Sequence, residues 1–578
     1  MNKLFLIVII TLFSGNLYAQ NTIQYSANKK QKLYYDSLAT FAPEKYKELT
    51  QSKILLPKNK DDCQLQKLVF GWYPYWQNGT EQNYQWNLLS DLSYFSYEVD
   101  PVTGYPLDIH NWKTANVIDL AQANGVRVNL CVTLFEDHAA FFASAAAQQN
   151  LIDSLLTLVQ YRNANGVNID FELVTESEAT HFNDFMVNLA QQFHSNIPDS
   201  QVSMALHAVD WNNVYDIPLL KNYIDLFIIM AYDYYWPSSS LAGPSGQLYT
   251  MNTFDYNISR SISTYLYQGI PKEKLLCGVP YYGYEWHTES ENVPSSTLNS
   301  GVARTVKTIK NNVNEYYNEK KINENSLCSY YTYYSSGNWH QAWVDDASTM
   351  KYKYDVIQHQ DLAGIGIWAL GYDDGYTEMW DLIRDCFSNC STTPCQYTIF
   401  DMGGPKRNYY NNEDYTFTIA PDNVSLLSLD FFEFSLESGY DSLWIYDGND
   451  TNAELIGGYS GTTSPGFVEA SGNALTLKFH SDGATVRSGW IAEWNCNPVN
   501  IETIPDNNII VYPNPANTFC SLFGTIPDKA QIIDINGKLL KQYKFKNTLN
   551  LSDLPEGIYL LKIISGNKIY IKKLIIQH

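Results

Sequence analysis

Short runs of β-branched and aromatic residues alternate with longer amphipathic stretches across residues 66–392. Eight such runs occur, at residues 68–74, 92–99, 126–134, 166–172, 202–208, 224–234, 275–282 and 364–370. Alternating strand and helix patterns build parallel sheets, and eight repeats predict an α/β fold, a closed (β/α)8 TIM barrel. The segment at about residues 285–360 is longer than one repeat needs, so we predict an insertion between the seventh and eighth strands.

The pattern changes after the eighth run. Residues 395–497 contain alternating strand patterns separated by Gly, Asn and Asp turns, with 14 acidic residues against 4 Lys and Arg. Residues 508–578 are also strand-rich but carry 9 Lys against 4 acidic residues, and residues 498–507, with two prolines, separate the segments. We therefore predict two all-β, sandwich-like C-terminal domains joined by a linker.

The first residues have the layout of a secretory signal peptide. Residues 1–19 carry a lysine, an apolar run and then Leu17-Tyr18-Ala19, so we expect cleavage after Ala19. The apolar run is shorter than the ~20 residues of a membrane helix, and no other stretch approaches that length, so we expect no membrane span in the mature chain. Residues 20–65 are polar and lysine-rich, which predicts a helical or loose leader.

Charge and cysteine content exclude several classes of protein. The formal net charge of -23 argues against nucleic acid and anionic membranes as partners, because binding phosphates requires clustered Lys and Arg. Nine cysteines in 578 residues are too few to form the main scaffold, and no Cys/His spacing resembles a zinc site. We expect buried thiols at Cys131 and Cys277, and disulfide candidates with open pairing at Cys386, Cys390, Cys395 and Cys496.

The fourth run carries the residues that point to chemistry. Residues 165–172 read Asn-Gly-Val-Asn-Ile-Asp-Phe-Glu, and side chains two apart on a strand face the same way. Asn168, Asp170 and Glu172 are therefore expected to point into the barrel, whose interior is normally apolar. Two acids this close repel as anions, which raises the pKa of one of them and lets it hold a proton near neutral pH. This row predicts an active site.

The segment resembles the strand-four signature of glycoside hydrolase family 18, in which alternating acids end in a glutamate. The resemblance implies that Glu172 is the catalytic acid that protonates the glycosidic oxygen. Family 18 uses substrate assistance in place of a protein nucleophile. The carbonyl of the substrate's 2-acetamido group attacks the anomeric carbon, giving an oxazolinium intermediate and net retention. Asp170 is then expected to hold the acetamido N–H and to stabilise the positive charge.

Two residues of this segment depart from the commonest family pattern. Asn165 and Asn168 stand where many family chitinases have aspartates. Asn168 cannot share a proton with Asp170, so we expect a different pH profile, with Asn168 contacting substrate. The Asn-Ile-Asp-Phe-Glu string also resembles spore-cortex-lytic N-acetylglucosaminidases, which act on peptidoglycan. A structural or lectin-like row of polar residues is the alternative interpretation.

Other predicted strand ends resemble the same family. Residues 230–233, Met-Ala-Tyr-Asp, imply that the Tyr232 hydroxyl bonds the acetamide carbonyl and that Asp233 binds a sugar hydroxyl or supports a residue that does. Residues 364–371 imply that Trp368 forms the hydrophobic floor under the reacting sugar. The seventh and first runs add Tyr281, Trp72 and Tyr75 as candidate cleft aromatics. Each of these strings is also compatible with an ordinary core residue, and their order along the chain gives the resemblance its weight.

The first C-terminal domain resembles a CUB domain. Residues 434–448, residues 479–482 and Gly489-Trp490 carry the resemblance. Many CUB domains bind calcium through a glutamate and two aspartates, and hard oxygen ligands suit that ion. Glu437, Asp441 and Asp482 match these positions, although the first two are closer in sequence than in many animal members. Solvated acids at loop ends are the alternative interpretation.

The last domain resembles the C-terminal sorting domain of the type IX secretion system of Bacteroidetes. Residues 511–516, 534–538 and 554–559, followed by lysines near the end, carry the resemblance. It implies export by that machinery and an extracellular or surface-attached protein. A small β-sandwich adhesion module is the alternative interpretation.

These features together predict a secreted hydrolase of β-1,4 bonds in glycans that contain N-acetylglucosamine, with chitin and peptidoglycan as leading substrates. An endo-acting hydrolase of N-glycan chitobiose cores is an alternative within the same chemistry. A non-catalytic, chitinase-like carbohydrate-binding protein is the alternative of another class. We expect no cofactor for catalysis, and a monomer.

Overall fold

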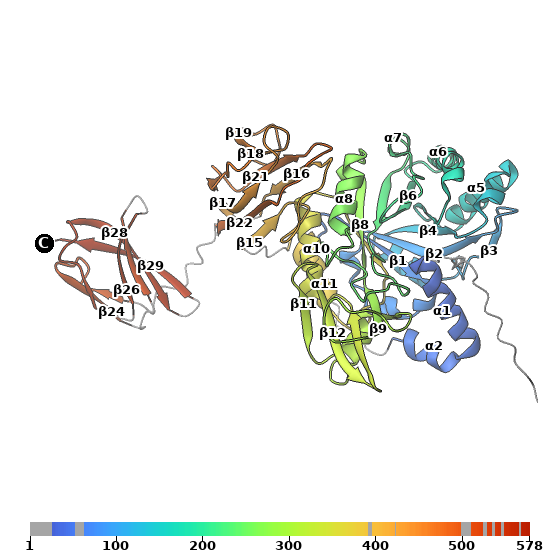
Figure 1. Ribbon diagram of the computed structural model, residues 1–578, viewed down its shortest axis with the longest axis horizontal. Coiled ribbons are helices and arrows are strands. Elements are labelled where there is room, and N and C mark those ends of the chain that lie inside the picture. The colour runs from blue at the N-terminus through green and yellow to red at the C-terminus, as the bar shows by residue number, and fades with distance from the viewer. Residues whose placement is uncertain are drawn as a thin grey trace, which may run out of the picture. The chain divides into compact units, whose positions relative to one another are not determined.

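The computed structural model describes residues 26–52, 63–390, 396–421, 424–498, 510–523, 529–534, 538–544, 548–565 and 568–577. They belong to two compact units, one within residues 1–498 and one within residues 499–578 (Figure 1). The predicted signal peptide, Cys395 and all of the predicted linker except Pro498 lie outside the described residues. Within these ranges no helix is both long and apolar enough to cross a membrane.

The eight predicted strands are present and form a closed parallel barrel, which confirms the predicted fold class. They are β1 (Leu68–Pro74), β2 (Asp91–Val99), β4 (Arg127–Leu134), β5 (Gly166–Phe171), β6 (Gln201–His207), β7 (Leu226–Met230), β8 (Leu275–Pro280) and β14 (Gly364–Trp368). The barrel is closed because β1 pairs in parallel with both β2 and β14. A short strand, β3 (Pro106–Asp108), pairs antiparallel with β2.

Helices surround the barrel (Figure 1). They are α3 (Asn116–Ala123), α4 (His138–Phe142), α5 (Ala145–Tyr161), α6 (Ala179–Asn196), α7 (Ile217–Leu220), α8 (Ile258–Tyr267), α10 (Ala347–His359) and α11 (Glu378–Phe387). The sequence of α5 illustrates why they form. The Ser144 side chain caps its first turn by accepting from the Ala147 N–H, and Leu151, Leu155 and Val159 follow at helical spacing on the buried face.

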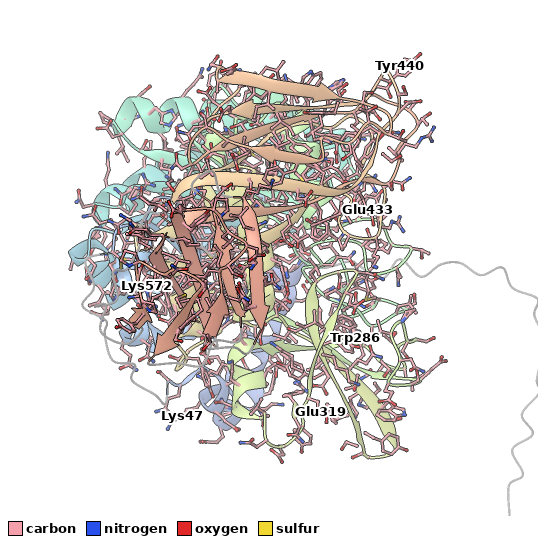
Figure 2. All side chains as sticks on the ribbon, turned by 90° about the vertical axis from the view of Figure 1, so that its left-hand side faces the viewer. Lys47, Trp286, Glu319, Glu433, Tyr440 and Lys572 are labelled. Atoms are coloured by element: carbon pink, nitrogen blue, oxygen red, sulfur yellow. A yellow bond between two sulfur atoms is a disulfide. The ribbon has the colours of Figure 1, made fainter. Side chains whose placement is uncertain are left out.

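The insertion lies between β8 and β14, where we predicted it. Its sheet has the order β10 (Val302–Thr305), β9 (Tyr282–Thr288), β13 (Asn338–Trp343), β12 (Cys328–Ser335) and β11 (Lys320–Asn323), with α9 (Val306–Asn311) beside it. Figure 2 labels Trp286 on β9 and Glu319 just before β11. Burial opposes ionisation of Glu285, but the Arg304 guanidinium at 2.8 Å and hydroxyl donors including Tyr317 outweigh it and lower the pKa of Glu285 to about 2. A charged carboxylate therefore holds this sheet together.

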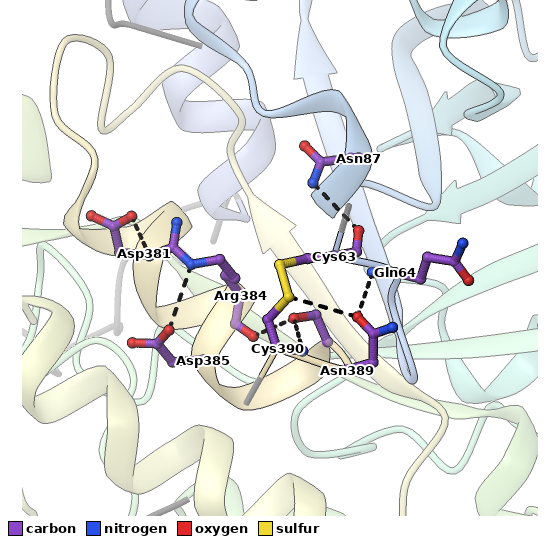
Figure 3. Close-up of a disulfide and its surroundings, with 9 residues drawn as sticks. Cys63, Gln64, Asn87, Asp381, Arg384, Asp385, Asn389 and Cys390 are labelled. Carbon is purple, nitrogen blue, oxygen red and sulfur yellow. Dashed lines mark hydrogen bonds and ion pairs between the residues drawn. A yellow bond between two sulfur atoms is a disulfide. The ribbon is translucent and has the colours of Figure 1, made fainter. Parts of the chain in front are cut away.

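The leader is helical where it is described. Helices α1 (Ala27–Phe41) and α2 (Pro43–Thr50) precede a disulfide between Cys63 and Cys390, which joins the two ends of the barrel segment (Figure 3). Beside it the Gln64 N–H donates to the Asn389 side chain at 2.8 Å. Cys496 is also disulfide-bonded. Our prediction of a disulfide at Cys386 is wrong, because this thiol faces the buried side of α11 and is free.

Cys131 and Cys277 are buried free thiols inside barrel strands, as predicted.

The first C-terminal domain is a sandwich of two four-stranded antiparallel sheets. One has the order β15 (Gln396–Phe400), β22 (Gly489–Pro498), β17 (Val424–Ser435) and β20 (Phe467–Glu469), and the other β16 (Asp414–Ile419), β21 (Leu475–His480), β18 (Ser442–Asp447) and β19 (Glu454–Tyr459). Hydrogen bonds join it to the barrel. On α8 the Ser259 hydroxyl donates to the Met402 carbonyl at 2.8 Å, and the Asn257 amide donates to the Tyr410 hydroxyl at 2.8 Å.

The second unit is also all-β. One sheet contains β23 (Ile510–Tyr512), β24 (Phe519–Phe523) and β27 (Thr548–Asn550), and the other β26 (Leu539–Lys544), β25 (Lys529–Ile533), β28 (Gly557–Ser565) and β29 (Lys568–Ile576). Its core includes Cys520, Leu522, Ile532 and Leu561, all buried. It has a hydrophobic core of its own, separate from that of the first unit.

Candidate active site

Strand β5 carries the polar row into the barrel. Asn168 is completely buried, accepts a hydrogen bond from the Trp72 indole at 2.8 Å and donates to the Ser203 hydroxyl at 3.0 Å. On the opposite face, Phe171 stacks on Phe185 of α6. The alternation therefore sends polar side chains inward and apolar ones to the helices, as the sequence predicted.

Asp170 and Glu172 share a buried environment that favours protonation. Burial raises the pKa of Asp170 to about 7, and a hydrogen bond from Asn28 opposes the rise. Burial, and next the charge of Asp170, raise the pKa of Glu172 well above its usual range. Because the pKa of Glu172 is raised further, Glu172 is the group that keeps its proton at neutral pH. The arrangement supplies a proton donor beside a carboxylate.

Tyr232 and Asp233 follow β7 and lie beside the two acids. Burial, together with the charges of Asp170 and Glu172, raises the pKa of Tyr232 well above its usual range, so its hydroxyl keeps its proton and can donate it. The nearby Asn28 side chain opposes this rise, but among the described residues no partner meets the geometry of a hydrogen bond to the hydroxyl. Asp233 accepts from the Tyr282 hydroxyl at 2.6 Å and from the Tyr284 hydroxyl at 2.9 Å. An unsatisfied donor thus faces the acids, while its neighbour is held in place.

The eighth barrel strand, β14, ends at Trp368. Trp368 is fully buried and makes edge contacts with Phe95 at 5.0 Å and Trp72 at 6.1 Å. Its indole N–H donates to Gln31 of the leader helix at 2.9 Å. A flat, fixed aromatic ring of this kind suits the apolar face of a sugar ring.

A cavity of about 460 Å³ opens beside Glu172. Tyr232 also lines it, as do Asn28 and Lys30 of the leader. Trp211 and Tyr256, whose ring centroids lie 4.5 Å apart, complete its aromatic lining. His207 also lines it, and burial lowers the pKa of this imidazole to about 4, so it is neutral at physiological pH. A concave, aromatic-lined cavity with a few polar groups is the usual form of a ligand site.

Comparison with known families decides the class of this site. A model of the glycosyl hydrolases family 18 matches residues 24–373, more than half of the chain. The chain belongs to glycosyl hydrolases family 18. It is a glycoside hydrolase whose barrel is followed by a CUB domain, matched over residues 388–494, and by a secretion system C-terminal sorting domain, matched over residues 510–577. The three regions stand in the order predicted from sequence.

Individual relatives of this family 18 hydrolase are distant. The chain is 23% identical over 248 residues, 42% of its length, to "Uncharacterized glycosylase YvbX" of Bacillus subtilis, and spans 67% of that protein. It is 21% identical over 315 residues, 52% of its length, to "Cortical fragment-lytic enzyme" of Bacillus anthracis, and spans 68% of it. It spans only 55% and 41% of two other relatives. A solved group IV chitinase of Ostrinia furnacalis in complex with allosamidin is 20% identical, with 56% of this chain and 97% of that chain covered and a TM-score of 0.49.

Several residues for which we predicted substrate contacts have other positions in this family 18 barrel. Asn168 and Trp72 hydrogen-bond each other in the barrel interior, and Tyr281 donates to or accepts from the hydroxyl of Tyr354 on helix α10. In this structure these side chains contact other barrel and helix residues, and their predicted substrate contacts stay predictions. Tyr75 lies at the rim, stacked on His110 at 3.7 Å and bonded to Asp36 of the leader.

Sequence reasoning also missed functional neighbours. Tyr282 and Tyr284 alternate on β9, so their shared side was readable from the period of two, although their target Asp233 was not. Asn28 and Gln31 reach the site from a segment that we predicted only as a leader. Nothing in the local sequence marks Trp211 as a cavity residue.

The CUB domain brings its three predicted acids together. Carboxylate oxygens of Glu437, Asp441 and Asp482 lie within 4.8 Å of one another. The first two belong to the loop before β18 that also carries exposed Tyr440 (Figure 2), and Asp482 follows β21. Asp441 is buried and is held by the Asp482 N–H at 2.9 Å and by the Tyr409 hydroxyl. Convergent carboxylates from two loops fit a hard cation such as calcium.

Proposed function

We propose that this family 18 hydrolase cleaves β-1,4 bonds of N-acetylglucosamine-containing glycans with retention, by substrate assistance. The observation that carries the proposal is the meeting of a protonated acid, Glu172, with the carboxylate of Asp170 and the free hydroxyl of Tyr232 in one buried site. These three groups match what a 2-acetamido sugar requires, namely a proton donor, an acceptor for its N–H and a donor for its carbonyl.

The reaction follows from these roles. Glu172 gives its proton to the glycosidic oxygen as the bond from that oxygen to the anomeric carbon breaks, and the acetamido carbonyl oxygen bonds to the same carbon. Asp170 accepts from the acetamido N–H and balances the positive oxazolinium, while Tyr232 donates to the carbonyl oxygen before it attacks. Water then attacks the anomeric carbon, the bond from that carbon to the acetamido oxygen breaks, and the water gives a proton to the Glu172 carboxylate. Trp368 supports the sugar ring throughout.

Chitin and peptidoglycan are the substrates that we propose. The relative named as a cortical fragment-lytic enzyme favours peptidoglycan, and the secretion system C-terminal sorting domain favours a polymer outside the cell. We further propose export by the type IX system to the medium or the cell surface. Calcium at Glu437, Asp441 and Asp482 is proposed as a structural ion of the CUB domain.

The decisive experiment compares the mature chain with its Glu172→Gln variant on chitin oligosaccharides, purified peptidoglycan and an N-glycopeptide. Both proteins are assayed with and without the three leader substitutions Asn28→Ala, Gln31→Ala and Tyr35→Ala, since these residues contact the site or its rim. Cleavage that Glu172→Gln abolishes, with products identified by mass, supports the proposal and names the substrate. Glycan binding without turnover in every form would instead favour a lectin-like barrel.

A further inference from the structure

The leader helix α1 has an unusual buried face. Asn28, Gln31, Tyr35 and Leu38 are buried at helical spacing, while Phe41 is 83% exposed. Asn and Gln are mostly exposed in proteins, and a helix that packs on a core presents apolar residues there. The two amides lie in the first turns of α1, so this end is suited to a polar pocket rather than to a core.

The buried amides contact the groups to which we assign the chemistry. The Asn28 side-chain N–H donates to the Asp170 carboxylate at 3.0 Å. The Gln31 carbonyl accepts from the Trp368 indole at 2.9 Å and from the Tyr372 hydroxyl at 2.6 Å. An amide N–H on Asp170 is the contact expected of the substrate's acetamido group, so the Asn28 carboxamide occupies the place of that group.

The charges of the leader complement those of the cleft. Lys29 pairs with Glu136 at 2.8 Å and Lys32 pairs with Glu98 at 3.1 Å. The N-terminus of α1, capped by Ser26, points toward the buried acids, where the positive end of a helix dipole is favoured. A basic helix end therefore lies against an acidic site.

Aromatic packing fixes the rest of the helix at the rim. The Tyr35 ring stacks on Trp76 with centroids 5.2 Å apart and planes 16° apart. Asp36 accepts from the Tyr75 hydroxyl on the same side. A glycan that lies over Trp368 and reaches Tyr75 would overlap with α1. The 460 Å³ cavity, which α1 borders through Asn28 and Lys30, stays open and extends to Trp211.

We propose that the leader helix, residues 26–41, is an intramolecular inhibitor that fills the position of the reacting sugar. The identity of the excluded ligand rests on the proposed function. Glycan has access only when α1 is displaced or removed, so the exported chain is held in a low-activity state. The Trp211 side of the cleft can still receive the other part of a substrate.

The test uses the full mature chain in two forms, one inactivated by Glu172→Gln for binding measurements and one with Glu172 intact for activity measurements. Asn28→Ala, Gln31→Ala and Tyr35→Ala together remove the amide contacts and the stacking, and Leu33→Ala with Phe41→Ala on the exposed face is the matched control. In the Glu172→Gln background, calorimetry measures binding of N-acetylglucosamine tetrasaccharide. Hydrogen exchange reports protection of residues 27–41, and the active background reports kcat/KM.

The triple variant is expected to bind the tetrasaccharide at least tenfold more tightly than the parent, because each lost hydrogen bond is worth about fivefold or more, the bond to the Asp170 carboxylate being the stronger kind. Saturating tetrasaccharide should also remove exchange protection from α1 of the parent. Equal affinity and activity in parent, triple variant and control would overturn the inhibitor role while leaving the proposed function intact. Absence of binding and cleavage in every form, leader released or not, would refute both.

Discussion

Replacing Asp170 by Asn tests the electrostatic reasoning at the site. The substitution keeps the shape and removes the charge that, after burial, contributes most to the raised pKa of Glu172. Side chains two residues apart on one strand face lie about 6.5 Å apart. At an effective dielectric constant near 20, two unit charges at that distance interact by about 2.5 kcal/mol, or about two pKa units.

The expected result concerns the alkaline limb of the pH profile. Glu172 must hold its proton to act as the acid, so activity falls as pH rises through its pKa. In Asp170→Asn that pKa is lower, and the limb should move down by about two pH units, in addition to an overall loss of rate. The assay is kcat/KM for a fluorogenic chitobioside from pH 4 to about 9 in the variant with α1 released.

Asp233→Asn is the matched control for this shift. Asp233 also raises the pKa of Glu172, but its charge ranks below that of Asp170. The alkaline limb of the pH profile of Asp233→Asn should therefore move less than that of Asp170→Asn, once each profile of kcat/KM is scaled to its own maximum. An unmoved limb in Asp170→Asn, or an equal shift in Asp233→Asn, would show that Asp170 does not set the pKa of the acid.

Three further predictions concern stability. Chelation with EDTA should lower the melting temperature of the CUB domain. In Asp441→Asn the melting temperatures with calcium and with EDTA should be equal. An equal melting temperature with calcium and with EDTA in the parent would contradict the ion site. Glu285→Gln should destabilise the barrel unit by about 3 kcal/mol, because it leaves the half-buried Arg304 without its charged partner. Thermal melting at pH 7 measures the loss of stability. A loss below about 1 kcal/mol would contradict the role of this ion pair. Cys63→Ser should cost about 2–5 kcal/mol in denaturant unfolding, with Cys386→Ser as a control that breaks no disulfide.

The barrel and its strand row were predictable because they depend on local periodicity. Alternation of two residues along β5 sends Asn168 and Asp170 to one face whatever the surroundings, and eight repeats leave few other ways to close a sheet. The CUB acids were readable through the resemblance to a CUB domain, and the structure brings their carboxylates together. The sequence was less informative about whether an aromatic side chain points into the barrel or toward the helices. Tyr281, which we predicted for the cleft, hydrogen-bonds Tyr354 on helix α10.

The (β/α)8 barrel, the acid pair and the order of the three domains follow from the sequence. The pairing of Cys63 with Cys390 and the hydrogen bonds from Tyr282 and Tyr284 to Asp233 are visible only in the folded chain. The contact of Asn28 with Asp170, 142 residues away in the chain, is likewise visible only there. Periodicity records only which face of its own element a residue occupies, whereas these contacts depend on which elements meet in space, and a short-range pattern carries no information about that.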